Sequence, residues 1–395
     1  MRSREEEQTL LVQTLCGEYR VRGRSGEAEA AAEVLAQPAV CRDSSAAREQ
    51  LRLSVEQLSG DRNTVCYDEA GYPSVMVRVP MVRCRDVLAS SEDAAPHPAF
   101  RSGRKTVREI LVSKYLNCVV DGRACSLPLA QPFAANSFDD AAGLCYRKGH
   151  GWMAMPFPLR MAIALGCRRE GFLPGGNNDS GADYFHPEER GTPVGATGLV
   201  LTGSGPRTWS HDRSENGLWD LNGNLSEWDG GFRLMDGELQ FVELPQLLDA
   251  SSVKSDSTAW HAVDAQGCPV PPGSPDALHY DVKGGKIRLV VRKECEGIGN
   301  CSFGEISAGE AAEVPEYLRL CGLYPDRNWS VMENEGWRWV STQGEFMPIC
   351  GGAYRAVDHA GVFFTGMTKA RSSRYSMAGV RCVYVAPEAI QEVVS

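Results

Sequence analysis

Apolar side chains recur at helical spacing through the first sixty residues of the chain. Three stretches show this spacing: Leu10, Leu11 and Leu15; Ala30, Ala31, Val34 and Leu35; and Leu51, Val55 and Leu58. Apolar residues three or four positions apart lie on one face of a helix. Short amphipathic helices with few aromatic residues rarely make a core alone, so we expect residues 1–66 to dock on partners or to mediate homo-oligomerisation. A solvated helical lead-in is the alternative.

The pattern then changes, because alternating apolar positions predict strands. We expect these strands at 74–82, 109–115, 238–242, 287–291 and 379–385. One helix is expected after Ser137, an N-cap residue followed by Asp140 three positions later. A second helix is expected at 159–169. Residues 232–330 form either an insertion or an extra lobe, and residues 387–395 form a tail.

Composition narrows the class of protein. The chain has 395 residues, of which 43% are hydrophobic and 23% charged, as in ordinary globular proteins. Its net charge of −10 lacks the basic footprint of a general nucleic-acid binder. No apolar run approaches the ~18 residues that span a membrane. The charged start of the chain does not lead into a secretory signal, so we expect synthesis in the cytoplasm and no membrane insertion.

The segment 217–228 carries the most specific candidate chemistry. Its Asn-Gly-Asn sequence at 222–224 requires a tight turn with positive φ. Asp220 and Glu227 flank this turn with hard carboxylate oxygens, and the turn adds backbone carbonyls. Calcium binds six to eight such oxygens in a flexible loop, so the spacing is compatible with a calcium site. A structural hairpin with solvated carboxylates is the alternative.

This segment resembles a motif of the sulfatase-modifying family, to which the formylglycine-generating enzyme belongs. The matching residues are Asp220, Gly223, Asn224, Glu227 and Trp228. The strand ending in Ser113-Lys114-Tyr115 and the glycine-rich segments at 351–354 and 379–382 also resemble that family. The resemblance covers roughly residues 70–235 and 335–386. It implies an α+β chain with a C-type lectin fold of this subtype, and calcium held by Asp220, Gly223, Leu225 and Glu227.

The resemblance does not extend to the family's chemistry. The family enzyme holds copper between two close cysteines late in the chain, whereas residues 353–378 contain no cysteine. Most of the 14 cysteines are expected to be small, buried and reduced, since none forms a Cys-x-x-Cys pair. The related sulfoxide synthases need a three-histidine motif near the N-terminus, but no histidine precedes His97. We therefore expect neither copper nor an enzyme.

A narrower resemblance concerns residues 337–382, which look like the variable region of a diversity-generating retroelement target protein. The matching frame consists of Gly351, Gly352, Ala360, Gly361, Val362, Phe363, Ala370, Arg371, Ser372, Gly379 and Arg381. The resemblance implies that residues between frame positions are diversified and bind ligand. These candidates are Tyr354, Arg355, Val357, Asp358, His359, Phe364, Thr365, Gly366, Met367, Lys369, Ser373, Arg374, Tyr375 and Met377. Mutated asparagine-type codons reach all of them except Met367, Lys369 and Met377.

These observations predict an N-terminal segment at 1–66 and a lectin-like domain at 67–386. The predicted function is non-enzymatic binding of a protein or glycan on a cell or particle surface. A virion-associated phage-tail protein or prophage adhesin fits this prediction, with phage or host structural proteins contacting the N-terminal helices. Two alternatives remain: a metal-dependent oxidase like the family enzyme, and a structural tail protein whose lectin-like domain does not vary.

Overall fold

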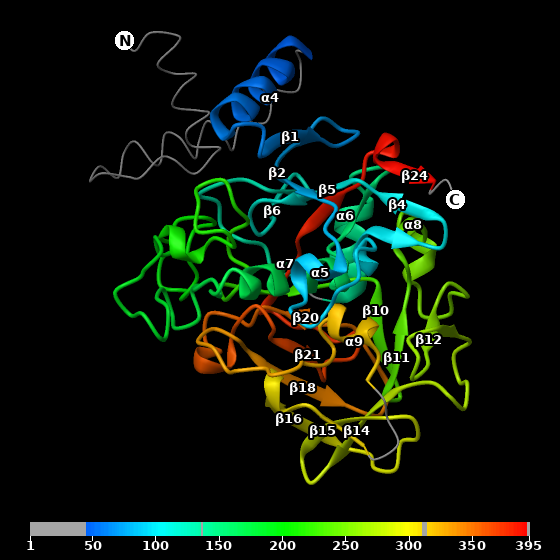
Figure 1. Cartoon of the computed structure of the whole chain (residues 1–395). Helices are drawn as coiled ribbons and strands as arrows, with labels where there is room; N and C mark the ends of the chain where they lie inside the picture. The colour runs from blue at the N-terminus through cyan, green and yellow to red at the C-terminus, as the bar shows by residue number, and fades with distance from the viewer. Residues whose placement is uncertain (1–44, 136, 310–313, 393–395) are drawn as a thin grey trace, which may run out of the picture.

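The computed structural model describes residues 45–135, 137–309 and 314–392, and combines helices with several mixed sheets in an α+β arrangement (Figure 1). The predicted helices near residues 10–15 and 30–35 lie outside this described part. Within it, no helix has both the length and the apolar character needed to cross a membrane.

The first sheet joins segments from both ends of the chain. Its five strands follow the order β1 (Asn63–Tyr67), β2 (Pro73–Pro80), β5 (Glu109–Ser113), β23 (Cys382–Tyr384) and β8 (Trp152–Ala154). All its neighbours are antiparallel, and β23 pairs Val383 with Val112 on one side and with Met153 on the other. The strands predicted around 74–82, 109–115 and 379–385 are thus confirmed, with shorter ends.

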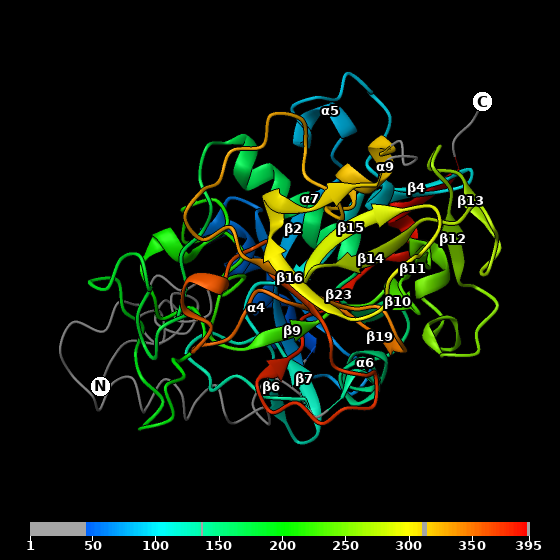
Figure 2. The same cartoon turned by 90° about the horizontal axis from the view of Figure 1, so that it is seen from below.

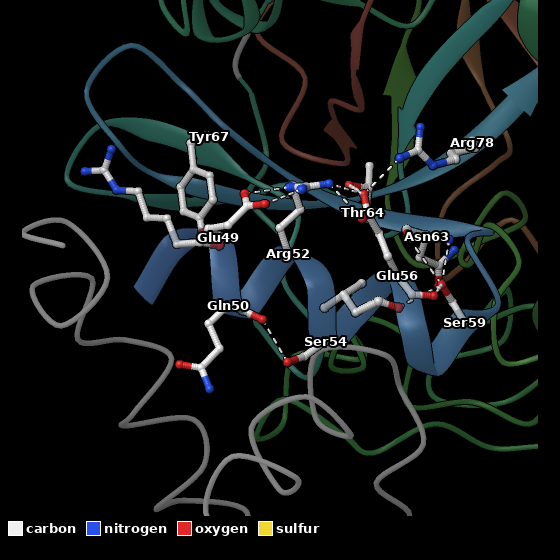
Figure 3. A network of polar contacts seen from close by, with 12 residues as sticks. Glu49, Gln50, Arg52, Ser54, Glu56, Ser59, Asn63, Thr64, Tyr67 and Arg78 are labelled. Carbon is white, nitrogen blue, oxygen red and sulfur yellow. Dashed lines mark hydrogen bonds and ion pairs between the residues drawn. The ribbon is translucent and has the colours of Figure 1, made fainter. Parts of the chain in front are cut away.

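Helix α4 (Ser45–Ser59) packs against β1, as Figures 1 and 3 show. Leu51 and Val55 are buried there, whereas Leu58 is 40% exposed. Glu56, a buried residue of α4, accepts hydrogen bonds from Arg52 on the same helix, from Thr64 of β1 and from Arg78 of β2 (Figure 3). The predicted boundary at residue 66 cuts β1, and Leu51 and Val55 of α4 share a buried apolar cluster with Val65 of β1.

Helices α6 and α7 lie on either side of strand β8 in the sequence. The Ser137 side chain accepts a hydrogen bond from the Asp140 backbone, so α6 (Phe138–Tyr146) begins as predicted. Helix α7 (Phe157–Arg169) is mostly buried and contacts two short helices, α5 (Cys84–Val87) and α9 (Glu316–Leu320). Such a helix needs apolar residues on nearly all sides, and here it also carries the buried Arg160.

Residues 232–330 supply most of a second, eight-stranded sheet. Its main order is β13 (Pro269–Val270), β12 (His261–Val263), β11 (Glu238–Phe241), β14 (His279–Lys283), β15 (Lys286–Val290) and β17 (Ser307–Ala308). Strand β10 (Phe232–Met235) joins β11 to β19 (Glu345–Phe346). Phe232 stacks on Phe157 of α7 with ring centroids 5.0 Å apart, and one buried apolar cluster includes both segments. The segment is packed onto the rest of the domain.

A third sheet positions the predicted variable region. Its order is β16 (Ile298–Ser302), β18 (Trp337–Ser341), β21 (Thr365–Met367), β20 (Ile349–Cys350), β9 (Ser226–Trp228) and β22 (Ala378–Gly379). Strand β9 follows the 222–224 turn, so this turn and the strands of the variable region share one sheet.

Two small sheets and several short helices complete the described chain. Strand β24 (Ile390–Glu392) pairs with β4 (Lys105–Val107), which pairs with β3 (Arg101–Ser102), so part of the predicted tail is integrated into the fold. Strand β6 (Cys118–Val120) pairs with β7 (Arg123–Cys125). The remaining helices are α8 (Leu244–Leu247), η1 (Pro98–Phe100), η2 (Arg207–Trp209), η3 (Ala250–Val253), η4 (Phe303–Glu305), η5 (Val357–His359) and η6 (Pro387–Ala389).

Candidate ligand-binding face

A buried charge network lies under the third sheet and involves Glu227. Arg381 donates to both oxygens of Glu227, over 2.9 Å to Oε2 and 3.0 Å to Oε1. Arg160 Nη2 donates to Glu227 Oε2 over 2.6 Å, and Arg160 also pairs with Asp229. All four side chains are almost completely buried. Two guanidinium groups therefore balance two carboxylates in a region without solvent.

The arginines of this network occupy the carboxylate oxygens that the predicted calcium site would need. Asp220 is also buried, but its Oδ2 accepts a hydrogen bond from the Gly203 backbone, and burial raises the pKa of Asp220 to about 6. Gly223 adopts the expected positive φ of 76°, and Leu225 is buried. Calcium needs several free, ionised oxygen ligands, whereas both Glu227 oxygens are bound by arginines. Asp220, Gly223, Leu225 and Glu227 therefore do not fit a calcium ion.

Arg381 also fixes the backbone around this network. Its Nη1 donates to the Ser113 carbonyl and its Nη2 to the Trp219 carbonyl, both over 2.7 Å. One frame residue of the predicted variable region thus ties β5, the 217–228 segment and β9 together. The planar guanidinium suits this role because it donates in several fixed directions.

Frame glycines let the variable region follow its scaffold closely. Gly351 has a φ of 86°, and a side chain there would press on the Leu221 carbonyl. Gly361 has a φ of 151°, and a side chain there would collide with the backbone of Asn334. Both positions therefore require glycine for conformation and for space.

Buried asparagines link the loops beneath residues 354–357. Their side-chain amides bridge neighbouring segments: Asn177 to Asn224, Asn178 to Asn334, and Asn222 to Asn334. Their backbones also hold the loop at residues 354–357. The amide of Tyr354 donates to the Asn224 carbonyl and that of Val357 to the Asn178 carbonyl, both over 3.0 Å. A buried hydrogen-bonded network rigidifies the loops that it connects, although Asn222 Oδ1 has no partner among the described residues.

Twelve of the fourteen predicted ligand residues reach the surface. The exposed ones are Arg355, Asp358, Lys369 and Arg374. The half-buried ones are Tyr354, Val357, His359, Phe364, Gly366, Ser373, Tyr375 and Met377. Both ends of the set lie near the start of β9, since the Tyr354 amide donates to the Asn224 carbonyl and the Ser226 amide donates to the Met377 carbonyl. Residues 369–374 lie next to α6, because Arg371 forms an ion pair with Asp139 of that helix.

Thr365 and Met367 are corrections to the predicted ligand set. Both side chains are fully buried, because alternate residues of β21 point to opposite sides of the sheet and only Gly366 points outward. Thr365 accepts a hydrogen bond from Arg338, and Met367 belongs to the apolar core. In this structure neither side chain can contact a ligand.

The sequence interpretation missed two tryptophans of the same surface. Trp337 and Trp339 are half-buried on β18, whereas Arg338 and Val340 between and after them are buried. The His359 ring lies 4.3 Å from the Trp337 ring and 5.9 Å from the Trp339 ring. The Trp-x-Trp spacing was the available signal, since period two places both indoles on one face. These two residues and the twelve surface candidates are called the candidate face below.

One cysteine pair does come together, although far apart in sequence. The Sγ atoms of Cys145 and Cys382 lie 2.7 Å apart and are fully buried. Burial raises the pKa of the Cys145 thiol well above its ordinary value. Copper needs accessible thiolates, so this fully buried pair differs from the accessible pair that an oxidase would use.

No family model and no curated protein matches this sequence. Two solved structures are similar at a low level. The Major Tropism Determinant U1 variant has a TM-score of 0.30 and 12% identity, over 80% of this chain and 65% of that one. Treponema denticola variable protein 1 has a TM-score of 0.33 and 10% identity, over 82% of this chain and 99% of that one. This chain thus spans about two thirds of the first protein. Neither score is high enough to assign fold or function.

Proposed function

We propose that this chain is a non-enzymatic receptor-binding protein with a C-type lectin fold of the formylglycine-generating-enzyme subtype, whose candidate face is diversified by a retroelement. The observation that carries the proposal is that eight of the eleven frame residues within 351–381 are buried, whereas twelve of the fourteen candidates reach the surface. The other three frame residues, Ala370, Arg371 and Ser372, lie at the surface. Exposed Arg355 and Asp358 lie between the buried frame residues Gly352 and Ala360, in a loop whose backbone is hydrogen-bonded to Asn178 and Asn224. A rigid scaffold tolerates replacement of such surface residues.

The composition of the candidate face supports binding of a surface protein or glycan. It combines aromatic residues, such as Tyr354, Tyr375 and Trp337, with arginines and small polar residues. Aromatic and arginine side chains dominate the binding energy of many interfaces. A phage-tail or prophage-encoded adhesin that is made in the cytoplasm would use such a face on a host cell. Residues 1–44 would then contact structural proteins or other copies of the chain, and several copies would add avidity.

Sequencing of the encoding locus and its flanks in a growing population tests the proposal. We expect a nearby reverse-transcriptase gene and a near-copy of codons 337–382, with differences confined to adenines of that copy. Variation should fall on the twelve surface candidates and spare Thr365 and the frame residues. An invariant locus without such a copy would contradict diversification and favour the structural tail protein. Turnover of a cysteine peptide with copper would instead favour the oxidase.

A further inference from the structure

A separate pocket of about 370 Å³ lies on the other side of the molecule from the segment that contains η5. Figures 1 and 2 both show β4 and β12, which flank the pocket, opposite the orange segment that contains η5. Its walls come from the start of β3, the segment after β11, and the β12–β13 hairpin. The volume falls in the range of small-molecule sites. Neither the frame nor the candidate face uses this pocket.

The pocket has an aromatic wall and an apolar floor. Phe241 contacts the Tyr317 ring edge-to-face at 5.2 Å and the His261 ring at 6.2 Å. Burial lowers the pKa of His261, so this imidazole is neutral at pH 7. Leu244, Leu247 and several prolines complete the apolar surface. An apolar ligand body would gain from contact with this surface.

Two opposite charges line the same pocket. Glu243 accepts a hydrogen bond from Ser102 through Oε2, while its Oε1 makes no hydrogen bond with any residue that the structure describes. Arg101 lines the pocket, and its guanidinium makes no hydrogen bond or ion pair with any residue that the structure describes. Both groups are half-buried, so each would gain from a ligand partner. The lining has no net charge, because one cation and one anion accompany a neutral histidine.

We propose that this pocket binds a small zwitterion, namely a free α-amino acid with an aromatic or branched apolar side chain. The ligand carboxylate pairs with Arg101, its ammonium pairs with Glu243, and its side chain lies against Phe241 and Tyr317. Charge-assisted hydrogen bonds at both ends would orient the ligand, and the aromatic wall would select its side chain. The site is independent of the proposed function of the candidate face.

Calorimetry on the full chain with three related probes tests this assignment. L-Phenylalanine carries both charges, 3-phenylpropionate lacks the ammonium, and 2-phenylethylamine lacks the carboxylate. We expect L-phenylalanine to bind and each single-charge analogue to bind about tenfold or more weakly. Equal binding of 3-phenylpropionate would overturn the zwitterion assignment, and so would absence of any binding of L-phenylalanine at millimolar concentration. This comparison needs no variant.

Variants then place the probe in the pocket. Arg101→Gln should weaken binding of L-phenylalanine about tenfold and leave 2-phenylethylamine unaffected, whereas Glu243→Gln should spare 3-phenylpropionate. Lys105→Gln is the matched control, because Lys105 is exposed on the adjacent strand β4 and does not line the pocket. The melting temperature without probe shows whether each variant is folded. Unchanged affinity in a folded Arg101→Gln variant would refute the site.

Discussion

Glu335 places a carboxylate in a buried position next to the predicted variable region. Trp329 donates its indole N–H to Oε1, but Oε2 is buried and has no hydrogen-bond partner among the described residues. Burial raises the pKa of Glu335 to about 7. The backbone of this residue is used as well, because the Glu335 carbonyl accepts a hydrogen bond from the frame residue Phe363 over 2.8 Å.

The raised pKa means that the folded state binds the proton of Glu335 more tightly than the unfolded state does. The free energy of unfolding therefore decreases as Glu335 loses this proton with rising pH. Its unfavourable contribution begins above the ordinary value of 4.5 and is complete above about 7. Glu335→Gln should therefore increase the free energy of unfolding at pH 8 by about 1–3 kcal/mol and have little effect at pH 4. Urea denaturation at both pH values measures this. Glu294→Gln, at an exposed carboxylate, is the control; parallel pH profiles of the two variants would contradict the prediction.

Arg381 should be the frame residue least tolerant of replacement. Arg381→Lys keeps the charge but cannot reach Glu227, Ser113 and Trp219 together, so the buried carboxylate loses hydrogen bonds. We expect a loss of about 3–5 kcal/mol in the free energy of unfolding. Arg374→Lys, on the exposed face, should change it by less than about 0.5 kcal/mol. Chemical denaturation distinguishes the two, and equal effects would show that Arg381 is not structural.

The same network predicts indifference to calcium. The two arginines already provide the positive charge that a metal would bring to Glu227, so neither calcium nor a chelator should stabilise the fold. Differential scanning calorimetry with excess calcium and with EDTA should give the same melting temperature. A rise with calcium concentration would mean that the ion binds the folded state, by mass action, and would restore the site predicted from the sequence.

At the scale of elements, α4 depends on Glu56 for its attachment. Burial alone would raise the pKa of Glu56, but hydrogen bonds from Thr64 and the charges of Arg52 and Arg78 keep it below its ordinary value. This carboxylate therefore stabilises the fold at neutral pH, and its contribution is lost as pH falls below about 4.5.

Glu56→Gln should weaken the packing of α4 on β1. Removing the charge leaves Arg52 and Arg78 without their shared partner, at an expected cost of about 1–3 kcal/mol. Hydrogen exchange of the amides in 45–59 should become faster, while that of α7 should change little. Glu49→Gln is the control on the same helix, since Glu49 is exposed and pairs only with Arg52. Equal exchange in the two variants would contradict the role of Glu56.

Elements with a strong local pattern could be predicted from the sequence. The Ser137 cap fixed the start of α6, and alternation identified β2 and β5, because both signals act within a few residues. Strand β24 could not be found, since it depends on β4, nearly 300 positions earlier in the chain. The burial of Thr365 and Met367 likewise depends on which side of β21 faces the core, where Arg338 donates to Thr365. The sequence of β21 alone does not show which side that is.

The expected calcium ligands show a related limit of local sequence. A carboxylate near a tight turn has the same local sequence whether its partner is a metal or an arginine. Arg160 and Arg381 reach Glu227 from 67 and 154 positions away, so only tertiary structure shows that they engage its oxygens.

At the scale of the whole molecule, tolerance to mutation should follow burial and not position along the chain. In a library that randomises residues 354–377, folded variants should accept most side chains at Arg355, Asp358 and Arg374. They should exclude charged residues at Thr365 and Met367, where an unpaired buried charge is costly. Display on cells with sorting for protease resistance gives the profile. Equal tolerance at buried and exposed positions would contradict the separation of frame and face.

The position of β23 has a consequence for chains that end early. Residues 382–384 lie between β5 and β8 inside the first sheet, and they follow residues 354–377 in the chain. A chain with a stop codon anywhere in 354–377 lacks this strand, and β5 and β8 lose their shared neighbour. Such a truncated product cannot close its sheet, so it would be degraded as unfolded protein. Under the diversification proposed above, the fold itself would admit only those products that contain β23.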